Sequence, residues 1–152
     1  MRIAIASDHA ALALKSDLCD WLRTQGHEVD DLGTHDAASV DYPDYGYKIA
    51  EAIAAGMAER GVALCGSGIG ISIAVNRVPG ARCALVSEPL SAGLARSHND
   101  ANVIAMGARL IGREMAQACL EAFLTTDFLG GRHQGRVDKL GHSPLNTAKV
   151  PA

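Results

Sequence analysis

Short apolar runs alternate with helix-length segments along most of the chain. The apolar runs have the length of buried strands, and we expect five of them, over 2–6, 28–32, 62–64, 82–86 and 102–106. The segments between them predict helices over 11–25, 45–59, 71–76, 88–97 and 113–124, with a short helix to follow over 133–140. Strands that alternate with helices in this way form one parallel sheet covered on both faces. The pattern therefore predicts a three-layer α/β/α fold with a doubly wound, five-stranded parallel sheet.

The first expected helix shows the spacing most clearly. Leu14, Leu18, Trp21 and Leu22 fall on one face, so Trp21 is explained better by packing against the sheet than by a ligand role. From Gly130 onward the chain becomes basic, rich in glycine and then polar. We therefore expect one Rossmann-like domain over 1–141 and a polar tail over 142–152.

Composition narrows the class of partner. The chain has 152 residues, 48% of them hydrophobic, and a net charge of −3, which gives no general attraction to nucleic acid or to an acidic membrane. No apolar run approaches the length of a membrane span, and the N-terminus lacks the apolar region of a secretory signal. Four widely separated cysteines are typical of thiols in a reducing compartment. We expect a cytoplasmic protein whose partner is a small molecule.

The candidate chemistry follows the strands. In an open α/β sheet, ligands bind beyond the carboxyl ends of the strands, and polar or reactive residues stand at these positions here. They are Ser7, Asp8 and His9, the segment 65–70, Ser87 and Glu88, and Gly107 to Arg109. In LCGSGIGIS, Cys65 ends a strand, and three alternating glycines lead into a helix, which leaves backbone N–H groups free to surround an anion. The alternative is an ordinary buried cysteine followed by a tight glycine turn.

Two other ligands fit the pattern less well. Gly66 and Gly68 match the first two glycines of a dinucleotide fingerprint, but Ile71 occupies the position of the third. Asp8 beside His9 does not by itself specify a metal, and no HxxxH or HExxH spacing occurs.

Histidines and arginines supply further candidates. His9 follows the first strand and His98 closes a helix beside Asn99, so two imidazoles could face one cleft and transfer protons, although each alone is more typical of a surface or capping residue. Arg132 and Arg136 are four residues apart, so a helix would present both to a phosphate. A solvated basic face is the alternative explanation.

Two more positions could contribute to the same site. Arg109, at the end of the fifth strand, is a second candidate phosphate ligand. In DYPDYGY, Asp41 and Pro43 are typical of a helix start, while Tyr42 could line a polar pocket.

Taken together, the motifs resemble those of ribose-5-phosphate isomerase type B and the sister isomerases of galactose 6-phosphate and allose 6-phosphate. The resemblance covers nearly the whole chain and is carried by SDHAALALK, DLGTHDAASVDYPDYG, LCGSGIGISIAVNRVPGARCALVSEP, ARSHNDANVIAMGARLIG and GGRHQGRV.

The resemblance implies a division of labour within the site. Cys65 would move a proton between C1 and C2 of the open-chain sugar through a cis-enediolate, and Ser67 would shuttle the proton between the two oxygens. His98 would open the furanose ring with Asp8 and Tyr42 nearby. The remaining binding residues that it implies are Gly66, Gly68, Ile69 and Gly70 for the oxyanion, His9, Arg132 and Arg136 for the phosphate, Arg109 reaching it from a neighbouring subunit, and Asn99 for sugar hydroxyls. Some relatives use a glutamate where this chain has Ile71, so the base here is expected to be Cys65.

The resemblance also implies a homodimer or homotetramer with sites between subunits, and no metal or organic cofactor. Ribose 5-phosphate is the expected substrate, with allose 6-phosphate, galactose 6-phosphate or a tetrose phosphate as alternatives, since the sequence diverges from the family after Val137. Two hypotheses from other classes are a nucleotide or sugar-phosphate binding module without catalysis, and a metal-dependent hydrolase or lyase that uses Asp8, His9 and His98.

Overall fold

The computed structural model describes residues 1–142, and residues 143–152, which hold most of the predicted polar tail, lie outside the described part. Its five strands are β1 (Arg2–Ser7), β2 (Glu28–Asp31), β3 (Arg60–Cys65), β4 (Cys83–Leu85) and β5 (Val103–Gly107). They form one parallel sheet in the order β2-β1-β3-β5-β4. The predicted five-stranded parallel sheet is confirmed, with each strand within three residues of its expected bounds.

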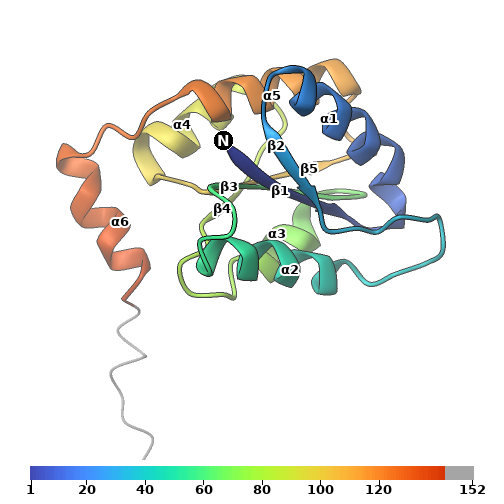
Figure 1. Ribbon diagram of the computed structural model, residues 1–152. Helices are drawn as coiled ribbons and strands as arrows, with labels where there is room; N and C mark the ends of the chain where they lie inside the picture. Colours follow the sequence, from blue (N-terminus) through green and yellow to red (C-terminus); the bar gives the residue numbers. More distant parts are fainter. Residues whose placement is uncertain (143–152) are drawn as a thin grey trace, which may run out of the picture.

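Helices cover both faces of this sheet (Figure 1). They are α1 (Leu12–Thr24), α2 (Tyr42–Ala54), α3 (Ile69–Val75), α4 (Pro89–Asn99), α5 (Arg113–Thr125) and α6 (Gln134–Leu140), with short 3-10 turns η1 (His9–Ala11) and η2 (Gly131–His133). Figure 1 shows α1, α4 and α5 on one face and α2 and α3 on the other, while α6 stands away from the sheet beside α4. The three-layer α/β/α architecture is thus as predicted.

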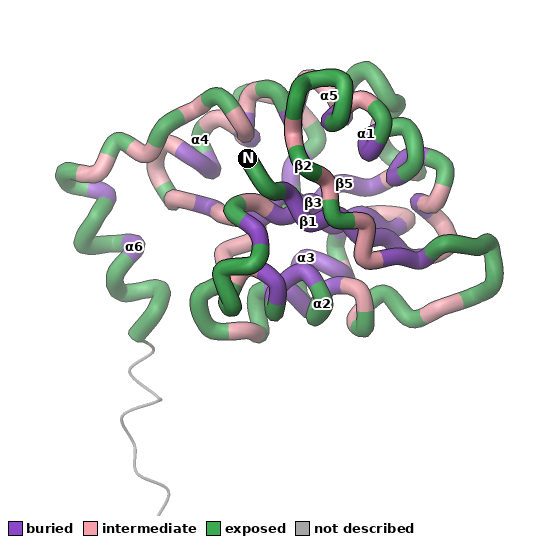
Figure 2. The backbone as a smooth tube through the Cα atoms, in the orientation of Figure 1, coloured by how far each residue is buried: buried purple, intermediate pink, exposed green. Residues whose placement is uncertain are grey.

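The core lies between these layers, as the purple segments of Figure 2 show. Strands β1, β3 and β5 are almost wholly buried, because helices pack on both of their faces. One apolar cluster joins the sheet to α1, α4 and α5 and includes Leu18, Leu22 and Phe123. Trp21 packs against this cluster, which confirms its structural role, and all four cysteines are free thiols.

Helix α2 departs most from its predicted bounds. It begins at Tyr42, three residues earlier than expected, because Asp41 takes the extended conformation of an N-cap residue and Pro43 suits the first turn. It ends at Ala54 rather than at residue 59, since Gly56 follows with a φ of 68° and turns the chain away from the helix. The earlier start places Tyr42 at the carboxyl edge of the sheet.

The strand order creates a switch point between β1 and β3, because the chain winds to one side of β1 and then to the other. The two strands end together: Ser7 pairs with Leu64, and the Asp8 N–H donates to the Leu64 carbonyl at 3.2 Å. The loops that follow them therefore meet where doubly wound proteins bind ligands. Within residues 1–142, no helix combines the length and the apolar character that crossing a bilayer requires.

Candidate active site

A cavity of about 330 Å³ opens at this switch point. Its walls come from the ends of β1, β3 and β5 with the loops after them, and from the starts of α2 and α3. The lining residues are Asp8, His9, Ala10, Tyr42, Cys65, Gly66, Ser67, Gly70, Arg109 and Leu110. Seven of the fourteen residues that the sequence indicated after the strands are therefore brought together in its lining. The volume is enough for a small phosphorylated metabolite.

Cys65 is held at the floor of the cavity by the loop that follows it. Its side chain is buried, and its Sγ accepts a hydrogen bond from the Gly68 N–H at 3.1 Å. Gly68 has a φ of 76°, a conformation that suits glycine, and this turns its N–H back toward the sulfur. A backbone donor aimed at the sulfur fixes the position of Sγ at the cavity wall.

The other three cysteines are poor candidates for chemistry. Burial, with Asp31 nearby, raises the pKa of Cys19 to about 11. Burial also raises the pKa of Cys119 to about 11 and that of Cys83 to about 12. These thiols stay protonated near neutral pH, and Cys65 is the cysteine of the described chain that lines the cavity.

Ser67 is oriented by the same loop. Its Oγ accepts a hydrogen bond from the Ile69 N–H at 3.2 Å, which leaves the hydroxyl proton free to be donated into the cavity. The loop is closely packed against β5, since a Cβ at Gly107 would lie 2.6 Å from the Ser67 carbonyl carbon. Gly70 similarly leaves room for Tyr42, whose ring would lie 2.5 Å from a Cβ there.

The residues after β1 form the opposite wall. Asp8 is buried, and its Oδ1 accepts the Ala10 N–H at 3.0 Å, which caps η1 and fixes the carboxylate beside the cavity. The His9 ring is fixed as well, because its Nδ1 accepts the Val40 N–H at 3.2 Å.

Arg109 belongs to this cavity through its own chain. Its backbone N–H donates to the Gly66 carbonyl at 3.0 Å, and its guanidinium packs over Gly66, where a Cβ would lie 3.3 Å from it. A cation is thus placed directly after Cys65. This location differs from the expectation that Arg109 reaches the phosphate from a neighbouring subunit.

His98 and Asn99 lie elsewhere. Helix α4 begins after the carboxyl end of β4 and runs back toward the start of β5, so its last residues lie at the amino edge of the sheet. Bonds to the starts of neighbouring strands confirm this position, since the Asn102 N–H donates to the Arg82 carbonyl and the Asn102 carbonyl accepts from Gly61. The prediction that His9 and His98 face one cleft is therefore wrong within a single chain.

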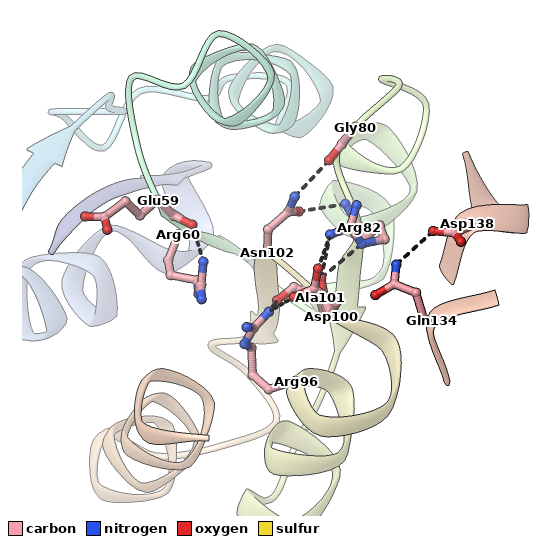
Figure 3. Close-up of polar contacts among 10 residues, drawn as sticks. All are labelled: Glu59, Arg60, Gly80, Arg82, Arg96, Asp100, Ala101, Asn102, Gln134 and Asp138. Atoms are coloured by element: carbon pink, nitrogen blue, oxygen red, sulfur yellow. Dashed lines mark hydrogen bonds and ion pairs between the residues drawn. The ribbon is translucent and has the colours of Figure 1, made fainter. Parts of the chain in front are cut away.

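The end of α4 is held firmly by charge. Figure 3 shows Arg96 and Arg82 converging on Asp100, with Nη to Oδ distances of 2.8 and 2.9 Å. Asp100 adopts a φ of 45° and ends the helix, while the Arg82 Nε and Nη2 also donate to its carbonyl oxygen. This network fixes the C-terminal end of α4, which carries His98 and Asn99.

Arg132 and Arg136 accompany His98 at that edge. The Leu129 N–H donates to the Ser97 carbonyl at 3.0 Å and brings η2 and α6 beside the end of α4. The His98 and His133 rings stack with centroids 4.3 Å apart and an interplanar angle of 9°. Burial, His98 and the two arginines lower the pKa of His133. The described chain therefore carries a second, basic group of predicted site residues that does not line the Cys65 cavity.

Sequence reasoning missed a buried ion pair that supports the β1 wall. Lys15 is 2% exposed, and its Nζ lies 2.5 Å from both carboxylate oxygens of Asp31. Asp31 accepts the Gly33 N–H at 3.0 Å, and the Gly33 carbonyl accepts the Ser7 N–H at 2.7 Å. The available signal was a lysine on the apolar stripe of α1, next to Leu14 and four residues after Ala11.

The potential ligands of a metal are not grouped in the described part of the chain. Among residues 1–142, no set of three or more His, Cys, Asp or Glu side chains is arranged to hold an ion.

Comparisons with known proteins place the chain in one family. A family model described as Ribose/Galactose Isomerase matches residues 3–140. The chain is 43% identical to ribose-5-phosphate isomerase B of Escherichia coli, over 91% of this chain and 93% of that protein. It is 42% identical to D-erythrulose-4-phosphate isomerase of Pectobacterium atrosepticum, over 93% of this chain and 94% of that protein. The solved structure of Clostridium thermocellum ribose-5-phosphate isomerase B is 48% identical, with a TM-score of 0.92 and coverage of 93% and 95% of the two chains.

Proposed function

Because the chain belongs to the ribose/galactose isomerase family, we propose that it interconverts the aldose and ketose forms of a phosphorylated sugar, with ribose 5-phosphate and ribulose 5-phosphate as its pair. The observation that carries the proposal is the placement of Cys65. Its sulfur receives a backbone N–H at the switch-point cavity, beside a serine hydroxyl and an arginine.

The proton transfer uses groups on this loop. The Cys65 thiolate takes the proton from C2 of the open-chain aldose, and the electrons of the C–H bond move to form a cis-enediolate. The Arg109 guanidinium stabilises the negative oxygen together with backbone amides of the 66–70 loop other than those of Gly68 and Ile69, which bond to Cys65 and Ser67. Ser67 moves a proton between O1 and O2, and Cys65 returns the carbon-bound proton to C1. The reaction moves one carbon-bound proton and one hydroxyl proton between C1–O1 and C2–O2 of the sugar, so it consumes no external oxidant or reductant.

Phosphate binding and ring opening are assigned to the remaining residues. His9 and Arg109 face the cavity from this chain, and Asp8 and Tyr42 lie close enough to its wall to assist ring opening. His98, Asn99, Arg132 and Arg136 are at the amino edge of the same chain, so they serve a Cys65 cavity only when a second copy supplies them. We therefore propose a homodimer with two sites, each built from both chains.

An exposed apolar surface supports this assembly. Ile69, Ile73, Leu85 and Leu94 are each at least 40% exposed, and they lie on α3, β4 and α4 around the free edge of the sheet. Exposed apolar side chains gathered beside an unpaired strand edge are typical of a subunit contact.

A panel of sugar phosphates tests the substrate. Ribose 5-phosphate, allose 6-phosphate, galactose 6-phosphate and a tetrose 4-phosphate are each incubated with the protein, and ketose formation is followed. We expect the highest kcat/KM with ribose 5-phosphate. Cys65→Ala should abolish conversion of every sugar, while the control Cys83→Ala, which removes a thiol outside the cavity, should retain it. Tight nucleotide binding without conversion of any sugar would instead favour a binding module.

Mixed dimers test the shared site. Cys65→Ala and His98→Ala should each be inactive on ribose 5-phosphate. When the two variants are produced together in equal amounts, half of the dimers contain one chain of each. In such a dimer one site combines Cys65 of the His98→Ala chain with His98 of the Cys65→Ala chain and is intact, while the other site lacks both. Activity should return to about a quarter of the wild-type value. A site built within one chain would regain none.

A further inference from the structure

The His9 imidazole is oriented by a backbone group from a distant part of the chain. The Val40 N–H donates to His9 Nδ1 at 3.2 Å, and the bond joins residues 31 positions apart in a partly buried setting. A backbone amide nitrogen can only donate, so the Nδ1 that faces it carries no proton. In the neutral ring the proton therefore lies on Nε2.

From this contact we infer that the Val40 backbone is a positioning group that holds His9 with Nδ1 as an acceptor, so that His9 directs its Nε2–H donor to the phosphate of the sugar. The inference rests on the proposed function in one respect: that function supplies the sugar phosphate as the acceptor of the His9 Nε2–H bond. His9 lines the cavity, and with Nδ1 occupied, Nε2 is its available ring nitrogen.

The charged and titratable groups that share the cavity with His9 are Asp8, Tyr42, Cys65 and Arg109. In this arrangement Arg109 provides positive charge for the phosphate, and His9 contributes a directed N–H donor.

Val40 is well placed for this task by the segment before α2. At the start of that segment, the Leu32 N–H donates to the Ile5 carbonyl and the Thr34 N–H donates to the Ser7 carbonyl, both at 2.9 Å. Asp36 then accepts the Ala38 N–H at 2.8 Å in a local turn. The bond from Val40 to His9 joins the far end of the segment to the end of β1, two residues before Tyr42 enters the cavity wall.

Nitrogen-15 NMR of the histidine rings tests the tautomer directly. The full-length protein, which has six histidines, is labelled at the imidazole nitrogens, and His9→Gln identifies the His9 signals. Near neutral pH, without substrate, we expect the coupling pattern of a ring protonated at Nε2 alone. A ring protonated at Nδ1, or at both nitrogens, would overturn the inference.

Two variants separate the backbone donor from the side chain. Val40→Pro removes the N–H, whereas Val40→Ala shortens the side chain and keeps it. With Val40→Pro, the KM for ribose 5-phosphate should rise by about three- to tenfold with a smaller change in kcat, because one orienting hydrogen bond to a bound group is lost. Val40→Ala should match the wild type. Equal KM values and identical tautomers for the two variants would refute the role of Val40.

If Val40→Pro does not fold, the spectrum of the wild-type protein still reports the His9 tautomer and so still tests the inference. Titration with inorganic phosphate should shift the His9 Nε2–H signal, and no shift at saturation would contradict the phosphate contact. A protein that isomerised no sugar phosphate but showed the expected tautomer would refute the proposed function and leave the Val40 contact standing.

Discussion

Gly107 offers a test of the site that alters no chemical group in it. This residue ends β5 and pairs with Cys65, and a Cβ there would lie 2.6 Å from the carbonyl carbon and oxygen of Ser67. Nonbonded carbon atoms settle near 3.5 Å, so with Gly107→Ala the loop at Ser67 has to withdraw by roughly 1 Å. The obstacle is backbone, which cannot rotate away as a flexible side chain can.

The expected magnitude follows from that displacement. Overpacking of this kind costs about 1–3 kcal/mol of stability, which a folded domain tolerates. A displacement of about 1 Å in a catalytic group lowers the rate by roughly 100-fold. Gly107→Ala should therefore remain folded in a thermal unfolding assay while its kcat/KM for ribose 5-phosphate falls by about two orders of magnitude.

Gly93→Ala is the matched control. Gly93 lies within α4, where a Cβ would meet only the Thr126 Oγ1 at an ordinary 3.6 Å. This variant should keep wild-type activity and gain stability from the higher helix propensity of alanine. If Gly107→Ala were folded and as active as Gly93→Ala, the close approach of β5 to the Ser67 loop would have no catalytic role, and the reasoning would be refuted.

Three further predictions concern other parts of the chain. His98→Ala should lower kcat/KM for ribose 5-phosphate by at least about 100-fold. It should spare a tetrose 4-phosphate, because that sugar has no free hydroxyl to close a furanose ring. Equal losses of kcat/KM on both sugars in a coupled assay would contradict ring opening by His98. Lys15→Met should reduce the free energy of unfolding in urea by about 2–3 kcal/mol, less than for a fully buried pair because Asp31 is a quarter exposed, and Lys15→Met with Asp31→Asn should recover part of the loss. The pKa of His133 is lowered from 6.5 in the folded chain. As the pH falls below 6.5, this imidazole is therefore protonated more readily in the unfolded chain than in the folded one, and the stability of the fold should decline. Thermal unfolding at pH 7.5 and 5.5 should show a smaller decline for His133→Asn, and an equal decline would count against this assignment.

The fold was predictable because four of the five described strands are short and apolar, with polar residues soon after them. Residues 2–6 and 62–64 read as buried strands from their composition alone, and their pairing follows from the alternation with helices. The end of α2 was misplaced because the alanine-rich stretch after Ala54 continues the helical composition, whereas the positive φ of Gly56 ends the helix.

The cavity residues were predictable for a related reason. Asp8, Cys65 and Arg109 each follow a strand, and parallel strands bring their carboxyl ends to one edge. His98 was misplaced because it ends a helix instead, and a helix between parallel strands returns to the opposite edge. The bond between Val40 and His9 and the pair of Lys15 with Asp31 depend on side-chain and backbone positions across the fold, which local patterns do not encode.

Solvent-proton exchange tests the central claim most directly, which is that Cys65 is the base of a sugar-phosphate isomerase. Ribose 5-phosphate is incubated in deuterated water with the wild type and with Cys65→Ala, and proton NMR follows both ketose formation and deuterium at C2 of the remaining aldose. The wild type should form ribulose 5-phosphate and introduce deuterium at C2. Cys65→Ala should do neither while it still binds inorganic phosphate. Conversion by Cys65→Ala at a rate near that of the wild type would contradict the assignment of the base.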